Sequence, residues 1–151
     1  RAEWSLAADL AMTVPVPVLA LPAESKVIDF DAPVMIAWNG SPQAAQALRS
    51  AVPLINSAQT VVMVQVGDND GGLAAEDALK YLSRHNIHGE LRLIDPGKET
   101  TATALSNAAK EIEPGLIVMG VFGRSMLRET LFGGVTQSLL DEAPAPLLIA
   151  H

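Results

Sequence analysis

Short apolar segments alternate with amphipathic ones from residue 33 to the end of this 151-residue chain. The alternation predicts an α/β fold with a mainly parallel sheet, because neighbouring parallel strands need a helical crossover between them. The expected strands are residues 34–38, 60–66, 88–94, 116–121 and 146–150, and the expected helices are residues 42–55, 73–86, 100–112 and 135–142. Pro53 is expected to kink or shorten the first helix. Alternating polar and apolar residues place the third strand near a sheet edge.

Four glycines surround the segment after the fourth expected strand. Gly120 and Gly123 follow that strand, and Gly133 and Gly134 open the last helix. Glycine frees the backbone for tight turns or for close approach to a ligand. Because the N–H groups at a helix start lack helical partners and attract anions, this order of strand, loop and helix predicts a phosphate site. In an open parallel sheet, such a ligand binds beyond the carboxyl ends of the strands, where the winding reverses.

The spacing Gly-x2-Gly-x9-Gly at Gly120, Gly123 and Gly133 resembles the pattern of the universal stress protein family, and the likeness runs from about residue 32 to residue 151. The resemblance implies an adenine nucleotide alpha hydrolase-like fold, whose five-stranded, doubly wound sheet has the strand order 3-2-1-4-5. One position departs from the family pattern, which usually has Ser or Thr after the third glycine. This chain has Gly134 there, and the next hydroxyl belongs to Thr136.

The resemblance also implies a binding site for ATP or a related adenine nucleotide, with or without Mg. Nucleotide-binding relatives usually have Asp at the adenosine end of the site, where this chain has Asn39. The backbone of Val66 is expected to meet adenine. The residues expected beside the ribose and the phosphates are Met119, Gly120, Gly123, Arg124, Gly133, Gly134, Val135 and Thr136.

Each of these assignments has a purely structural alternative. The first glycine pair can serve as turn glycines, and the second pair as a hinge at a helix entry. Asn39 can hold its own turn through an Asx contact, Arg124 can lie on a solvated face, and Thr136 can cap its helix. The missing hydroxyl at Gly134 weakens nucleotide binding without abolishing it, since a hydrogen bond to a charged group contributes about 1.5–3 kcal/mol, or about tenfold to a hundredfold in affinity.

Composition narrows the classes of function. A net charge of −7 argues against a nucleic-acid partner, and no stretch approaches the roughly 20 apolar residues of a membrane span. The absence of cysteine excludes thiolate catalysis and favours a cytoplasmic location. The three histidines have no carboxylates at metal-ligand spacing, and the sequence contains neither a nucleophile elbow nor a Walker motif. No catalytic residue and no metal site is therefore predicted.

Two hypotheses follow for the function. The first is a stress-response sensor or regulator that binds an adenine nucleotide and has at most slow ATP hydrolysis. The second is a stress protein scaffold without a cofactor, which acts through dimer and partner contacts. Gly134 and Asn39 favour the scaffold, whereas the three spaced glycines and Thr136 favour the sensor.

The first residues of the chain echo its end, because residues 14–20 repeat in outline the Pro-rich approach and apolar strand of residues 142–150. The echo predicts that residues 1–22 are the remnant helix and strand of a preceding unit, residues 23–32 a linker, and residues 33–151 the universal stress protein domain. In dimers of the family the closing strands of two units lie side by side. This implies either a homodimer or an intrachain pseudo-dimer in which residues 16–21 pair with residues 147–150. A disordered leader is the alternative, whereas Pro15 and Pro17 argue against a signal peptide.

Overall fold

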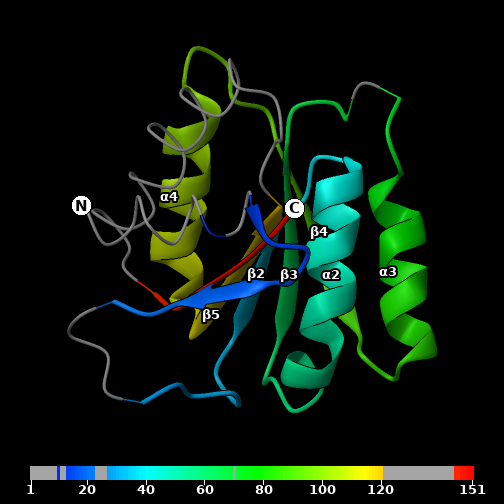
Figure 1. The fold of residues 1–151 in the computed structure, drawn as a ribbon. Helices are drawn as coiled ribbons and strands as arrows, with labels where there is room; N and C mark the ends of the chain where they lie inside the picture. The colour runs from blue at the N-terminus through cyan, green and yellow to red at the C-terminus, as the bar shows by residue number, and fades with distance from the viewer. Residues whose placement is uncertain (1–9, 11–12, 23–26, 70, 121–144) are drawn as a thin grey trace.

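The computed structural model describes residue 10 and residues 13–22, 27–69, 71–120 and 145–151. The described part is an α/β structure with one six-stranded sheet, in the order β1-β6-β5-β2-β3-β4. The elements are β1 (Val18–Ala20), β2 (Val34–Ala37), α2 (Pro42–Ile55), β3 (Val61–Val66), α3 (Ala75–Arg84), β4 (Gly89–Ile94), α4 (Thr101–Ile112), β5 (Leu116–Gly120) and β6 (Leu147–Ala150). Helix α4 covers one face of the sheet, and α2 with α3 covers the other (Figure 1).

The predicted strand order is confirmed for the five strands of the main domain. The first of them, β2, lies between β3 and β5, and the parallel pairs β2–β3, β3–β4, β2–β5 and β5–β6 give the order 3-2-1-4-5. The sixth strand, β1, is added outside β6 and runs antiparallel to it. The predicted edge position of the third strand is also correct, since β4 ends the sheet on the opposite side.

The observed elements end close to their predicted boundaries. The largest difference is in α3, which spans Ala75–Arg84 instead of residues 73–86. Asn86 has a φ of 61°, a left-handed conformation that cannot continue a right-handed helix. The predicted helix 135–142, and residue 121 of the fourth predicted strand, lie outside the described residues.

Capping side chains mark the start of two helices. The Oγ of Ser41 accepts the N–H of Ala44 at 3.0 Å before α2, and the Oγ1 of Thr100 accepts the N–H of Thr103 at 3.1 Å before α4. Each cap satisfies an N–H group that has no partner within its helix. Pro53 does not shorten α2, which continues to Ile55, so this part of the prediction is wrong. Pro53 lies exposed in the last turn, where its missing N–H removes a single helical hydrogen bond.

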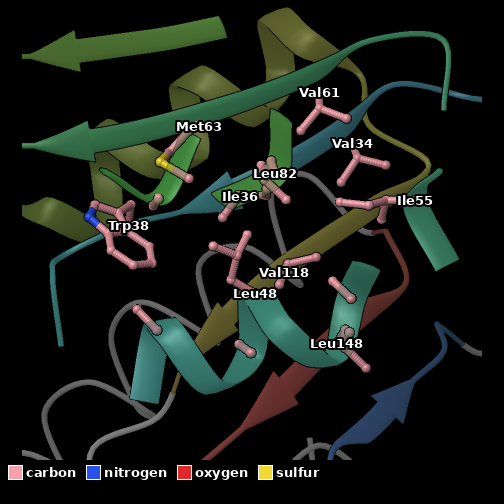
Figure 2. Close-up of a cluster of buried hydrophobic side chains, with 14 of the residues drawn as sticks. Val34, Ile36, Trp38, Leu48, Ile55, Val61, Met63, Leu82, Val118 and Leu148 are labelled. Carbon is pink, nitrogen blue, oxygen red and sulfur yellow. The ribbon is translucent and has the colours of Figure 1, made fainter. Parts of the chain in front are cut away.

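Two hydrophobic layers hold the sheet between its helices. Because successive strand residues point to opposite faces, Val34 and Ile36 pack toward α2 and α3, while Met35 packs toward α4. Figure 2 shows the first layer, in which side chains from β2, β3 and β5 meet Leu48 of α2 and Leu82 of α3. Burying an apolar side chain of this size contributes about 1.5–3 kcal/mol. The two layers therefore fix the sheet, and with it the carboxyl ends of its strands.

Candidate functional site

The carboxyl ends of β2, β3 and β5 lie at one edge of the sheet, and the winding reverses between β2 and β5. Ligands of open parallel sheets bind at such a point. The structure brings four of the predicted site residues to this edge, namely Asn39 after β2, Val66 at the end of β3, and Met119 with Gly120 at the end of β5. The other predicted site residues, Gly123, Arg124, Gly133, Gly134, Val135 and Thr136, lie outside the described residues.

The main chain of Val66 at this end of the sheet has no hydrogen-bond partner in the part of the chain that the structure describes. The N–H of Trp38 donates to the C=O of Val64 at 2.9 Å, and the N–H of Gly67 donates to the C=O of Ile94 at 2.8 Å. Main-chain groups alternate between the two sides of a strand, so the N–H and C=O of Val66 point toward β2, as those of Val64 do. The last residue pair of β2 is with Val64, so β2 has ended before it reaches Val66. Neither group of Val66 is hydrogen-bonded to another described residue.

Asn39 holds the turn after β2. Its Oδ1 accepts the N–H of Ser41 at 3.1 Å, which is the Asx contact expected as the structural alternative for this residue. The side chain is exposed, so its amide N–H2 group lies at the surface as a hydrogen-bond donor. An Asp here would offer a second, charged acceptor oxygen, whereas Asn39 offers a neutral donor.

Packing alone explains the two residues of β5. Met119 is buried in the layer under α4, so only its main chain can contact a ligand at the carboxyl end of β5. A Cβ atom on Gly120 would lie 2.4 Å from the N atom of Ala44 and 2.4 Å from the carbonyl C atom of Gln43, both in the first turn of α2. Glycine therefore lets β5 and α2 approach each other, and this close approach, rather than a turn, accounts for Gly120.

The start of α2 has few donors left for an anion. The N–H of Ser41 donates to Asn39, Pro42 has no N–H, and the N–H of Ala44 donates to the Oγ of Ser41. Side chains thus occupy two of the N–H groups that a phosphate could use at this helix start, and that of Gln43 remains. A phosphate bound at this end of the sheet therefore needs further donors, and the segment that follows β5 is the one that the sequence predicts.

A network that the sequence-based prediction missed ties the loop after β3 to the turn after β2. The Nε1–H of Trp38 and the Nδ2–H of Asn69 both donate to the C=O of Leu73, each at 3.0 Å. The N–H of Leu73 donates to the C=O of Gly40 at 2.9 Å. Gly40 has a φ of 77°, and a Cβ there would lie 2.9 Å from the carbonyl oxygen of Leu73. The signal in the sequence was Trp38 itself, since a buried indole N–H needs an acceptor.

Replacing Trp38 with Phe is expected to lower the free energy of unfolding by about 1 kcal/mol, because one buried hydrogen bond is lost. Asn69 still donates to Leu73 in this variant. In an Asn69→Ala background the same change leaves the carbonyl without either donor, so the combined loss should exceed the sum of the single losses. Urea unfolding of the four chains, followed by circular dichroism, measures the difference. Strictly additive losses would contradict the shared carbonyl.

In the part of the chain that the structure describes, no group of three or more His, Asp or Glu side chains could hold a metal ion. His85 lies beside Tyr81, with ring centroids 4.8 Å apart, and is exposed. Among the described helices, none has the length and apolar character needed to cross a bilayer.

The comparisons with known proteins agree with this geometry. A model of the Universal stress protein family matches residues 32–151. A structure of a universal stress protein family member from Burkholderia pseudomallei is 27% identical, with a TM-score of 0.57, and the match covers 80% of this chain and 96% of that chain. A universal stress protein from Archaeoglobus fulgidus DSM 4304 is 20% identical, with a TM-score of 0.70, over 96% of this chain and 53% of that chain. A universal stress protein solved in complex with cAMP is 18% identical, with a TM-score of 0.52, over 80% of this chain and 97% of that chain. No curated protein is similar enough in sequence to be matched.

Proposed function

The chain belongs to the universal stress protein family, and we propose that it binds ATP or a related adenine nucleotide in the crevice between β2 and β5. The nucleotide acts as a signal in a stress response, and its hydrolysis is at most slow. The observation that carries the proposal is that the N–H and C=O of Val66, at the carboxyl end of β3, have no hydrogen-bond partner among the described residues. The relative solved with cAMP supports an adenine nucleotide as the class of ligand.

In this proposal the main chain of Val66 recognises the base. Adenine places an acceptor ring nitrogen beside a donor amino group. The N–H of Val66 donates to the former and its C=O accepts from the latter. Two neutral hydrogen bonds contribute about 0.5–1.5 kcal/mol each, whereas micromolar affinity needs about 8.2 kcal/mol. The main chain of Val66 therefore orients the base, and most of the affinity has to come from stacking and from the phosphates.

The ribose and phosphates are proposed to lie between the turn after β2 and the segment after β5. The side-chain N–H2 of Asn39 donates to a ribose hydroxyl, since its oxygen is engaged with Ser41. The main chain of Met119 and Gly120 lines the ribose side. The remaining proposed contacts, inferred from the sequence pattern and with or without Mg, come from Gly123, Arg124, Gly133, Gly134, Val135 and Thr136.

Two residues favour the alternative hypothesis, in which the chain is a scaffold without a nucleotide. Gly134 lacks the hydroxyl that nucleotide-binding relatives usually have, and Asn39 uses its oxygen within its own turn. In this second function the chain carries no nucleotide and acts through contacts with a dimer partner or another protein. The two functions differ in a single measurable property, which is the presence of bound nucleotide.

Protein that is desalted and then heat-denatured is expected to release adenine nucleotide into the supernatant, because a ligand held in the crevice survives rapid buffer exchange. Chromatography of the supernatant with absorbance detection identifies the nucleotide and its amount per chain. Protein carrying Val66→Pro, prepared in parallel, should release much less, since its residue 66 cannot donate. A clean supernatant from the wild-type protein, together with no binding at millimolar ATP, would select the scaffold.

We also propose that residues 1–22 are the end of a preceding unit, that residues 23–32 are a linker and that residues 33–151 are the nucleotide-binding domain. The sequence echo, the β1–β6 pair and the relative of which this chain spans 53% support this division. A cytoplasmic location is proposed from the lack of cysteine. Mass spectrometry of the protein from its natural source tests the division, and a native chain that begins at residue 1 would contradict it.

A further inference from the structure

We propose that β1 occupies the outer edge of β6 in place of the β6 strand of a second copy, and that it thereby prevents the chain from pairing with itself. The edge strand of a sheet has unpaired N–H and C=O groups that recruit further strands. In this chain β1 satisfies those groups from within the molecule. The inference does not depend on nucleotide binding and rests on the register of the β1–β6 pair.

The sequences around β1 and β6 match at a constant offset. Residues 15–20 consist of Pro-x-Pro followed by three apolar residues, and residues 144–149 have the same arrangement. When the Pro-x-Pro motif before β1 is aligned with the Pro-x-Pro motif before β6, each residue of β1 has an equivalent residue in β6. The equivalent pairs are Val18 with Leu147, Leu19 with Leu148, and Ala20 with Ile149.

The observed register is symmetric about the centre of this match. Leu19 lies opposite Leu148, which is its own equivalent. On either side the equivalents exchange, so that Val18 lies opposite Ile149 and Ala20 lies opposite Leu147. The same exchange arises when two copies of one strand pair about a two-fold axis, because residue i then lies opposite residue j and residue j opposite residue i. β1 thus stands in the register that the β6 strand of a second copy would adopt, with the axis passing beside Leu148.

The alternation of main-chain groups shows which atoms join β1 to β6. The N–H of Ile117 in β5 donates to the C=O of Pro146 at 2.9 Å, so Pro146 and Leu148 face β5. The main-chain N–H and C=O groups of Leu147 and Ile149 therefore face β1, and those of their opposite residues face β6. The N–H groups of Val18 and Ala20 point toward β6, whereas the N–H of Leu19 points away from it.

The tether between β1 and β2 explains why the intramolecular strand prevails. The covalent connection through residues 21–33 gives β1 a local concentration at β6 on the order of a millimolar. At about 50 μM protein, a second copy is then disfavoured by about twentyfold against β1. Side-chain burial acts in the same direction, since Ala20 and Val18 pack into the layer under α4. Weakening the β1–β6 hydrogen bonds should therefore open the edge to another chain.

The test removes these hydrogen bonds in the 151-residue chain with Val18→Pro and Ala20→Pro together. Proline has no N–H, so both donors toward β6 are lost. Light scattering after gel filtration at tens of micromolar is expected to show the wild-type chain at its mass of 15.9 kDa and the double variant at twice that mass. Leu19→Pro is the matched control, because that N–H points away from β6, and it should remain monomeric. Circular dichroism establishes that every variant is folded.

Disulfide trapping tests the register, because the chain contains no cysteine. In the double-proline background, Leu148→Cys is expected to give a disulfide-linked dimer, since facing residues across a strand pair have Cα atoms about 4.5–5.5 Å apart. Ile149→Cys lies two strand positions from its counterpart and should not cross-link. The proposal is overturned if the folded double variant stays monomeric, if both cysteine positions cross-link equally, or if Leu148→Cys cross-links as readily without the prolines.

Discussion

Replacing Gly120 with alanine is expected to lower the free energy of unfolding by about 3 kcal/mol, at the upper end of the range for overpacking a core. The added Cβ would lie 2.4 Å from main-chain atoms of Gln43 and of Ala44. Main-chain atoms of a helix start cannot turn aside as a flexible side chain can, so β5 and α2 have to separate. That separation disrupts the layer in which Val118 packs against α2 (Figure 2).

A second glycine provides the matched control for this effect. Gly67 has a φ of 70°, and a Cβ there would have no atom of the described residues within 4 Å. Gly67→Ala therefore introduces only the strain of a left-handed conformation, about 1 kcal/mol. Urea unfolding followed by circular dichroism measures both losses on the same scale. Equal losses for the two variants would mean that close packing is not the reason for Gly120.

The second large effect is expected at Val66, where a proline should weaken adenine-nucleotide binding by about tenfold to a hundredfold. Proline removes the N–H that donates to the base and leaves an acceptor of the buried base unpaired, which costs about 1–3 kcal/mol. The substitution leaves the sheet ladders intact, because the N–H of Val66 is not hydrogen-bonded to another described residue. The last residue of a strand also tolerates proline better than its middle does.

Val66→Ala is the control that separates the main chain from the side chain. It shortens the side chain at the same position and keeps the N–H, so the affinity should stay within a few-fold of wild type. Calorimetric titration of the three chains with ATP gives the comparison, after circular dichroism has shown that each is folded. If Val66→Pro binds as tightly as Val66→Ala, the base is not recognised by this stretch of main chain.

The elements could be predicted from the sequence alone, whereas the order of the strands was predicted through the resemblance to the universal stress protein family. Apolar runs such as residues 61–66 and the capped helix starts at Ser41 and Thr100 are local signals, and the strand–helix alternation restricts how they can be connected. The echo between the two ends of the chain also predicted that residues near 18–20 pair with β6. It could not predict the register, because a shift along β6 leaves the same residue types in contact.

The candidate site was less predictable because its contacts join residues that are distant in the chain. Nothing local shows that Gly120 lies against the first turn of α2, or that the indole N–H of Trp38 reaches Leu73. For Asn39 the Asn-Gly-Ser sequence is compatible with both a ligand contact and an Asx turn, and the structure shows the turn. β2 leaves the N–H and C=O of Val66 without a partner because it ends before it reaches this residue, and the lengths of paired strands depend on the whole sheet.

The most direct test of nucleotide binding is a calorimetric titration of nucleotide-free wild-type protein with ATP and with cAMP. Saturable binding at one site per chain is expected for at least one of the two ligands, with a loss of at least about tenfold in the Val66→Pro chain. If folded wild-type protein produces no binding heat with either ligand at millimolar concentration over several temperatures, the crevice between β2 and β5 is not an adenine-nucleotide site.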